Sequence, residues 1–152
     1  MGEPFTVEEI NNIMKKALLE ARKAIGSEDI PIGCVITDSS GNVLSSGHNT
    51  SYSEGIIHGH AEINAINNLP KNAPDALFLF VTMEPCPMCT GAILESRIRT
   101  VFYGTPNVKL GALGTVCNLG SGIIAAYGGF LADECSALVS DFFKEKRTPR
   151  ID

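Results

Sequence analysis

The 152-residue sequence contains no tryptophan, and its basic residues are outnumbered by its acidic ones. Twelve Lys and Arg against seventeen Asp and Glu give a formal net charge of −5. Because binding to nucleic acid depends on clustered cations, this deficit argues against a generic nucleic-acid-binding protein. Fifteen glycines and no tryptophan favour tight turns and close backbone approaches over a bulky aromatic core.

Long apolar segments are also absent. No run approaches the ~20 apolar residues that a membrane-spanning helix needs. The opening MGEPFTVEE has acidic residues where a signal peptide would have a basic and then an apolar stretch. Five cysteines, an odd number, argue against a disulfide framework. We therefore expect a cytoplasmic protein without membrane contacts, folded as one domain over residues 1–152.

The first half of the chain has the hydrophobic spacing of a helix followed by a hairpin. Thr6 and Glu9 form a capping-box pattern, and the helix that they begin is expected to end at Gly26. Two β-rich runs follow at 31–38 and 43–49, separated by a turn near 40–42. After a polar loop at 50–57, a short helix is expected at about 59–69.

The second half alternates strands and helices. The continuous apolar run at 76–83 predicts a strand buried on both faces, and a helix at 85–95 separates it from a strand at 97–104. Residues 104–129 contain seven glycines, which predicts a loop with one short strand at 122–127. An amphipathic helix from Phe130 ends among the basic residues Lys144, Lys146, Arg147 and Arg150. The pattern indicates an α/β fold around a single sheet.

Two short strings carry the chemistry: His60–Ala61–Glu62 and Pro85–Cys86–Pro87–Met88–Cys89. Two thiolates and one imidazole form a three-ligand zinc set whose fourth tetrahedral position stays open for water, which is typical of a catalytic site. His-x-Glu followed by Pro-Cys-x-x-Cys is also the signature of the zinc deaminases.

Helix starts are the expected positions of both strings. Cys86 and Cys89 share one helix face, and the helix dipole favours their thiolates. His60 and Glu62 are two residues apart, so they can serve one site only in a first helical turn. His58 competes for the ligand role, but only His60 is followed by a glutamate two residues on.

Other interpretations exist for each motif. Cys-x-x-Cys alone is compatible with a thioredoxin-like redox pair. A closed structural zinc site, as in a non-catalytic zinc-stabilised module that binds nucleotides or RNA, would need a fourth ligand such as His58 or Cys117. Cys34 and Cys135 lie in apolar patterns and are expected in the core, and His48 is expected to be a polar hairpin residue.

With these motifs the chain resembles the cytidine deaminase superfamily, and within it the bacterial tRNA adenosine deaminase branch, which is related to yeast-type cytosine deaminase and guanine deaminase. The resemblance covers nearly the whole chain. It includes IPIGCVI (30–36), GHN (47–49), HAE (60–62), VTMEPCPMCTGAI (81–93), SRI (96–98), NVKLGALG (107–114) and LADECSALVSDFF (131–143). It implies a three-layer α/β/α fold with a sheet of about five strands, and a homodimer.

The resemblance also implies roles for individual residues. His60, Cys86 and Cys89 match the ligands of one Zn²⁺ per chain, and Glu62 matches the catalytic proton shuttle. Asn49 matches a residue that binds the substrate base or ribose. Glu84 is a candidate substrate-binding residue at the pocket edge, or equally a solvated loop carboxylate. The implied reaction is hydrolysis that replaces an exocyclic amine of a base by a carbonyl and releases ammonia.

The substrate is less clearly indicated by the sequence. The string 96–98 and the basic end of the last helix favour a tRNA-specific adenosine deaminase. The net charge of −5, the absence of basic residues from 115–129 and the string Ile-Ile-His-Gly at 56–59, in place of Pro-Thr-Ala, favour a free nucleobase or nucleoside. We therefore expect a small-molecule substrate, with tRNA as the alternative.

Overall fold

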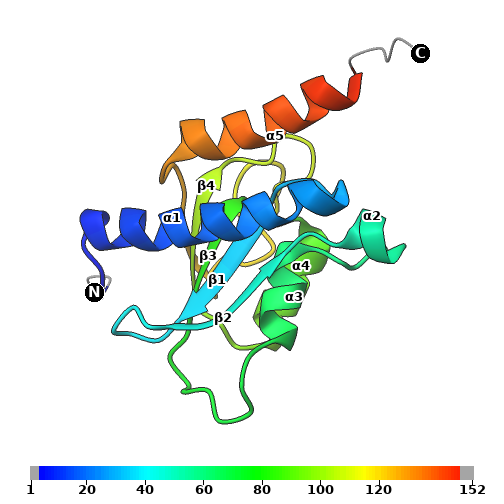
Figure 1. Cartoon of the computed structure of the whole chain (residues 1–152). Helices are drawn as coiled ribbons and strands as arrows, with labels where there is room; N and C mark the ends of the chain where they lie inside the picture. The colour runs from blue at the N-terminus through cyan, green and yellow to red at the C-terminus, as the bar shows by residue number, and fades with distance from the viewer. Residues whose placement is uncertain (1–3, 148–152) are drawn as a thin grey trace.

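The computed structural model describes residues 4–147, which form a five-stranded mixed sheet between two layers of helices (Figure 1). The strand order is β2-β1-β3-β4-β5. Strand β1 is antiparallel to both neighbours, whereas β3, β4 and β5 are parallel. The strands are β1 (Gly33–Thr37), β2 (Val43–His48), β3 (Phe78–Met83), β4 (Thr100–Thr105) and β5 (Ala125–Tyr127). The α-helices are α1 (Val7–Lys23), α2 (Ser51–Glu54), α3 (Ala61–Asn67), α4 (Pro87–Glu95) and α5 (Ala132–Arg147). Arg150 lies outside the described residues.

Helix α1 begins as its sequence predicts and ends earlier than expected. Thr6 caps the helix, and both hydrogen bonds of the capping box with Glu9 are present. The expectation that Gly26 ends the helix is wrong: α1 stops at Lys23, and a 3₁₀ turn follows over Ile25–Ser27. Glu28 follows this turn in the left-handed conformation, with φ 64°. Its backbone N–H donates to the carbonyl of Ile25 and thereby closes the turn.

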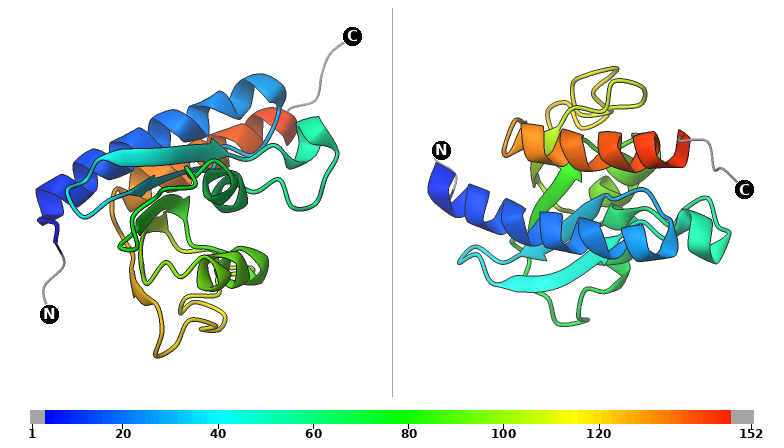
Figure 2. Two further views of the ribbon diagram at one scale, coloured as in Figure 1. Left: turned by 90° about the horizontal axis from the view of Figure 1, so that it is seen from below. Right: turned by 45° about the horizontal axis from the view of Figure 1, so that its top comes forward.

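The two helical layers cover opposite faces of the sheet (Figure 2). Helices α1 and α5 pack over Val35, Phe80 and Phe102, whereas α3 and α4 pack over the other face. The expectation of a core without bulky aromatic groups is wrong for the first face. Phe80 and Phe102 stack there with ring centroids 4.8 Å apart, and Phe5 adds edge contacts. Phenylalanines thus provide the aromatic part of this core.

One edge of the sheet gathers the segments that bear the predicted functional residues. Strand β2 ends at His48, β3 at Met83 and β4 at Thr105, and all three run in the same direction. Strand β1 runs the opposite way and therefore starts at this edge. The residues that follow three strands are consequently neighbours, although more than 50 positions separate Asn49 from Asn107 in the chain.

Close approach between strand and helix backbones explains a glycine in β1. A Cβ atom at Gly33 would collide with the carbonyl oxygen of Ala17 and the amide nitrogen of Ala21, both in α1. Because backbone atoms cannot rotate away as a side chain can, α1 would have to shift from the sheet. The sequence prediction of close backbone approaches is confirmed at this contact.

Gly33→Ala is therefore expected to lower the free energy of unfolding by about 3 kcal/mol, at the upper end of the usual cost of overpacking. Urea denaturation measures this change. Gly91→Ala in α4 is the matched control, because a Cβ there meets nothing within 4 Å, and its effect should be neutral or slightly stabilising. Equal stability of the two variants would contradict the proposed role of the contact.

The long glycine-rich connection between β4 and β5 is irregular, as expected, and a bridge between Leu113 and Asn118 closes part of it. The polar stretch 50–57 contains the short helix α2, which hydrophobic spacing did not predict. None of the helices within residues 4–147 combines the length and apolar character that crossing a bilayer requires.

Candidate active site

Helix α3 begins in the way that the His-x-Glu string requires. His60 is the N-cap residue with extended backbone angles, and Glu62 lies in the first turn. Both side chains therefore lie at the start of the helix, although they are only two residues apart. Glu62 is buried, with 4% of its surface exposed. The prediction that the two residues occupy a first helical turn is confirmed.

Helix α4 begins directly opposite, after β3. Cys86 is its N-cap residue, Pro87 follows at the first helical positions, and Cys89 lies one turn along. Pro87 suits this position because the missing N–H would have no partner inside the helix. Both cysteines are buried. The positive end of the helix dipole favours the thiolate form of Cys86, whereas the hydrogen bond with Cys86 and burial raise the pKa of Cys89.

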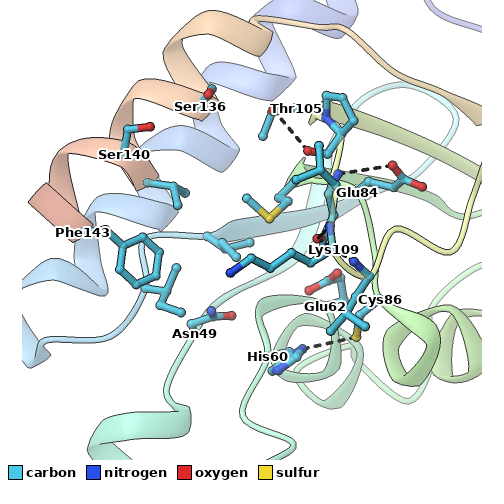
Figure 3. Close-up of a pocket in the computed structure, with 18 residues that line it drawn as sticks. Asn49, His60, Glu62, Glu84, Cys86, Thr105, Lys109, Ser136, Ser140 and Phe143 are labelled. Carbon is cyan, nitrogen blue, oxygen red and sulfur yellow. Dashed lines mark hydrogen bonds between the residues drawn. The ribbon is translucent and has the colours of Figure 1, made fainter. Parts of the chain in front are cut away.

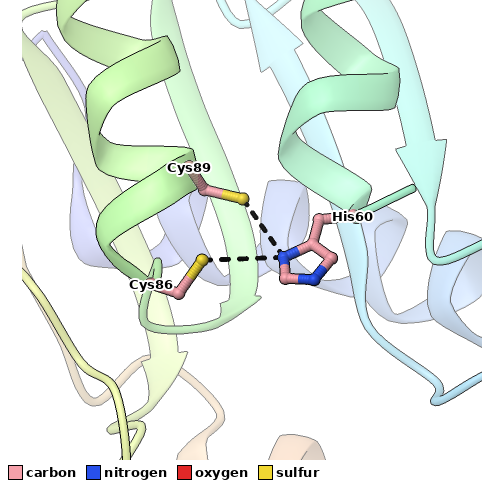
Figure 4. Close-up of side chains that lie close together, drawn as sticks. All are labelled: His60, Cys86 and Cys89. Carbon is pink, nitrogen blue, oxygen red and sulfur yellow. Dashed lines mark hydrogen bonds between the residues drawn. The ribbon is translucent and has the colours of Figure 1, made fainter. Parts of the chain in front are cut away.

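The two helix starts bring three metal-binding side chains together (Figure 4). Nδ1 of His60 lies 3.6 Å from Sγ of Cys86 and 3.4 Å from Sγ of Cys89. All three donor atoms lie within 4.8 Å of one another, so that one ion can contact them all. Two sulfurs and one imidazole nitrogen are a donor set that suits Zn²⁺.

The residues that would close the coordination shell lie elsewhere. Among residues 4–147, the grouping of potential metal ligands contains His60, Cys86 and Cys89 but neither His58 nor Cys117. Both of those side chains are exposed. The arrangement thus favours His60 over His58 as the ligand. A redox pair would leave the position of His60, against both sulfurs, without an explanation.

Burial and hydrogen bonding shift the pKa values of the site. The thiol of Cys89 and the ring of His60 lower the pKa of Cys86 to about 4, which makes its thiolate available to a metal. Hydrogen bonding with Cys86 raises the pKa of His60. Burial raises the pKa of Glu62 to about 7, and the nearby Cys86 sulfur adds to this shift. The Glu62 carboxyl can therefore exchange protons near neutral pH.

Asn49 is buried and held by its own backbone and by α3. Its side-chain oxygen accepts a hydrogen bond of 2.9 Å from the N–H of Ala61, and its backbone N–H donates to the carbonyl of Ile32 at 3.2 Å. Because the oxygen is occupied, the side-chain NH₂ remains to meet a ligand in the pocket, which Asn49 lines together with His60 and Glu62 (Figure 3).

Glu84 also lines this pocket, but its carboxylate is 1% exposed, so it is not a solvated loop carboxylate. Its oxygens accept hydrogen bonds from backbone N–H groups of the loop that follows β4. The cysteines expected in the core, Cys34 and Cys135, are buried. His48 lies at the end of β2 in the hairpin, as expected, and its ring hydrogen-bonds to Glu20 of α1 at 2.7 Å.

Asp29 and Lys109 are two further residues near the site, to which sequence reasoning assigned no role. Oδ1 of Asp29 accepts hydrogen bonds from the N–H groups of Tyr52 and Ser53 at 2.8 and 3.0 Å, and thereby holds α2 in the segment that leads to His60. Lys109 points into the pocket from the loop after β4 (Figure 3). Local periodicity gives no signal for either residue: the partners of Asp29 lie 23 and 24 positions away, and Lys109 lies in an irregular loop.

The pocket has a volume of about 630 Å³. Its walls come from the residues that precede β1, from those that follow β2, β3 and β4, from the start of α3 and from α5. A second cavity of about 420 Å³ shares Ile30, Asn49, His60 and Phe143 with it, and extends to Tyr52 and Lys146. The two cavities thus share part of their walls beside the metal-binding cluster, and they are together called the groove.

Comparison with known proteins agrees with this geometry. Residues 7–105 match the model of the cytidine and deoxycytidylate deaminase zinc-binding region. The tRNA-specific adenosine deaminase of Haemophilus influenzae is 37% identical over 144 residues, which cover 89% of this chain and 83% of that protein. A solved structure from a study of A-to-I editing by tRNA:A34 deaminases has a TM-score of 0.76 and 31% identity, with 84% of this chain and 98% of that chain covered.

A third relative is much longer than this chain. The tRNA(Ile)-lysidine synthase of Deinococcus deserti is 35% identical over 159 residues, and the match covers 99% of this chain but only 30% of that protein. The family model covers well over half of the chain, and both of its metal-binding strings fall within the matched residues. The chain therefore belongs to the cytidine and deoxycytidylate deaminase family, whose zinc-binding domain serves hydrolytic deamination.

Proposed function

We propose that this protein deaminates an adenosine within a tRNA to inosine, with release of ammonia. The observation that carries the proposal is that a second cavity adjoins the pocket at the metal-binding cluster and shares Asn49 and His60 with it. A cavity of about 630 Å³ falls in the range that holds drug-sized ligands, so it leaves room beside a single base. Relatives such as the Haemophilus influenzae protein, which carry the name tRNA-specific adenosine deaminase, support the same substrate.

The second cavity offers the chemistry that a neighbouring nucleotide requires. Tyr52 is 68% exposed, and Nζ of Lys146 lies 5.4 Å from the centroid of its ring. Nζ of Lys146 also lies 3.0 Å from Glu28. Aromatic rings stack on bases and ammonium groups contact phosphates, so that this end of the groove suits a flanking nucleotide.

In the proposed reaction, His60, Cys86 and Cys89 hold one zinc ion. Zinc, when bound, acts as a Lewis acid that makes water nucleophilic near neutral pH. The Glu62 carboxylate accepts a proton from the attacking water and delivers it to the ring nitrogen beside the amino-bearing carbon. The carboxylate then takes the proton of the newly added hydroxyl and passes it to the departing amine, so that the C–N bond breaks, a carbonyl forms and ammonia leaves. Asn49 orients the nucleoside through its side-chain NH₂, and the apolar wall of the pocket excludes bulk water.

A free nucleobase or nucleoside is the second candidate substrate. Segment 115–129 contains no Lys, Arg or His, and the chain has a net charge of −5. Both features oppose the phosphate contacts on which binding to a polynucleotide depends.

Ammonia release separates the two candidates. The zinc-loaded protein is incubated with an adenosine-containing anticodon stem-loop, and in parallel with cytosine, guanine, adenine and their nucleosides. Turnover of the stem-loop, with inosine in the product, is the expected result. Turnover of a free base or nucleoside without turnover of the stem-loop would overturn the proposal in favour of the second candidate. The Glu62→Gln variant controls for a contaminating deaminase.

Asn49→Asp is expected to lower kcat/KM by about 10- to 100-fold, the usual cost of leaving a buried polar group of the complex unpaired. Aspartate can still accept the hydrogen bond from Ala61, but it presents an oxygen where asparagine presents NH₂. Steady-state kinetics measure the effect, and zinc content should stay unchanged. Asn67→Asp on the exposed side of α3 is the matched control. Equal kcat/KM for the two variants would contradict a substrate contact by Asn49.

A further inference from the structure

Glu84 is a buried carboxylate that has no cationic partner. It lies between β3 and the metal-binding Cys86, with 1% of its surface exposed. None of the ion pairs among residues 4–147 includes it. A buried charge is expensive unless hydrogen bonds replace its hydration. The groups that provide these bonds therefore identify what Glu84 holds in place.

Within the part of the chain that the structure describes, the hydrogen-bond partners of the Glu84 carboxylate all come from one loop, residues 107–115. Oε2 accepts hydrogen bonds from the backbone N–H groups of Leu113 at 3.0 Å and Thr115 at 3.2 Å. Oε1 accepts one from the N–H of Asn107 at 3.3 Å and another from the hydroxyl of Thr115. The carboxylate thus connects the first residue of the loop, Asn107, to the last, Thr115.

The shape of the loop fits this contact closely. A Cβ atom at Gly111 would lie 2.6 Å from both Cδ and Oε1 of Glu84, so that only glycine allows the backbone to pass over the carboxylate. The adjacent Ala112 donates its N–H to the carbonyl of Pro85 at 2.9 Å. The loop is therefore attached to the two residues that immediately precede Cys86.

The other side of the same loop forms a wall of the substrate pocket. Val108, Lys109 and Leu110 line the pocket and are exposed. Figure 3 shows Lys109 reaching into the pocket from this loop, on the side of Glu62 and Asn49. One segment thus contacts a buried carboxylate with its inner side and presents a cation and two apolar side chains to the substrate with its outer side.

We propose that Glu84 is a positioning residue for substrate binding: its carboxylate holds loop 107–115 in the conformation that places Lys109 and its neighbours at the pocket. The kinetic consequence rests on the proposed deaminase function, whereas the structural consequence does not. Substrate affinity should depend on Glu84 although the side chain touches no reacting atom. The proton transfers assigned to Glu62 should not depend on it.

The test is Glu84→Gln in the zinc-loaded protein. Glutamine presents an NH₂ group to a ring of N–H donors, so that at least one bond becomes a repulsive contact. We expect the amides of Leu113 and Thr115 to exchange hydrogen at least about 10-fold faster, as for a locally opened segment. We expect KM to rise at least about 10-fold for whichever substrate the wild type turns over, kcat to stay within about threefold, and zinc to remain at one per chain.

Two further variants keep the result interpretable. Glu95→Gln makes the same chemical change at an exposed position of α4 and should alter neither exchange nor KM. Thr115→Val removes one donor and leaves the carboxylate intact; it should give a smaller effect in the same direction, and it provides the comparison if Glu84→Gln does not fold.

Each outcome bears on the proposal in a distinct way. Unchanged exchange of Leu113 and Thr115 would overturn it whatever the substrate is. Faster exchange with unchanged KM would overturn the role of the loop in binding. A fall in kcat together with loss of zinc would overturn it in favour of a role in supporting Cys86. Failure of the tRNA proposal appears separately, in the wild-type substrate panel, and does not alter the exchange experiment.

Discussion

Replacing Glu62 by Gln is expected to lower kcat by about 10³-fold or more while one zinc per chain is retained. General acid–base groups contribute typically 10²–10⁴-fold, and this carboxyl is assigned several successive proton transfers. The side chain is 4% exposed, so that bulk water has little access to replace it as a proton carrier. Glutamine keeps the size of the side chain and removes the proton-accepting carboxylate.

Ammonia release gives the rate for this variant, and metal analysis gives the zinc content. Glu8→Gln in the exposed part of α1 is the matched control and should be fully active. If Glu62→Gln keeps more than a tenth of the wild-type kcat, the proton shuttle must be another group. If it loses zinc, the loss of activity says nothing about proton transfer, and Glu62 instead supports the metal site.

Cys89→Ala is expected to abolish activity by removing a metal ligand. Cys89 is fully buried, and its sulfur lies 3.4 Å from Nδ1 of His60. With two ligands left, zinc content should fall from one per chain to near zero. Zinc that binds only the folded state stabilises it by roughly 4 kcal/mol when its concentration is 1,000 times its Kd, so the variant should also unfold at lower temperature in zinc-containing buffer.

The control for this variant is Cys135→Ala, another buried cysteine, which lies in the core cluster of α1 and α5 and outside the ligand group. It loses the same sulfur atom from a packed interior, so it measures the cost of packing alone. It should be somewhat less stable than the wild type, with its zinc and its activity intact. A Cys89→Ala protein that still holds one zinc per chain would contradict the ligand assignment.

The sequence was sufficient to predict those parts of the site that depend on local spacing. His60 and Glu62 are predicted within a single helical turn, and so are Cys86 and Cys89, because the geometry of a helix start is fixed by a few consecutive residues. The hairpin and the βαβ unit follow equally from alternation and continuous apolar runs. The deaminase chemistry was predictable because it depends on these short strings.

Contacts between distant segments could not be predicted in this way. The partners of Glu84 lie 23 to 31 positions away, and no periodicity links a loop to a carboxylate across that distance. Phe5 joins the aromatic cluster only because α1 crosses the sheet above Phe80. The cavity at Tyr52 depends on the approach of Lys146 in α5 to that ring. Without these contacts the sequence favoured a small-molecule substrate, with tRNA as the alternative.

The direction of the strands also places the pocket at one end of the sheet and leaves loops at the other end that should accept insertions. The turn at 38–42 and the connection at 68–77 lie at the edge of the sheet opposite the ends of β2, β3 and β4 (Figure 1). Residues 70–76 are largely exposed, and exposed loops accept insertions well. A fluorophore or an affinity tag inserted there would report on the protein, or immobilise it, without reaching the groove in which the substrate is expected to bind.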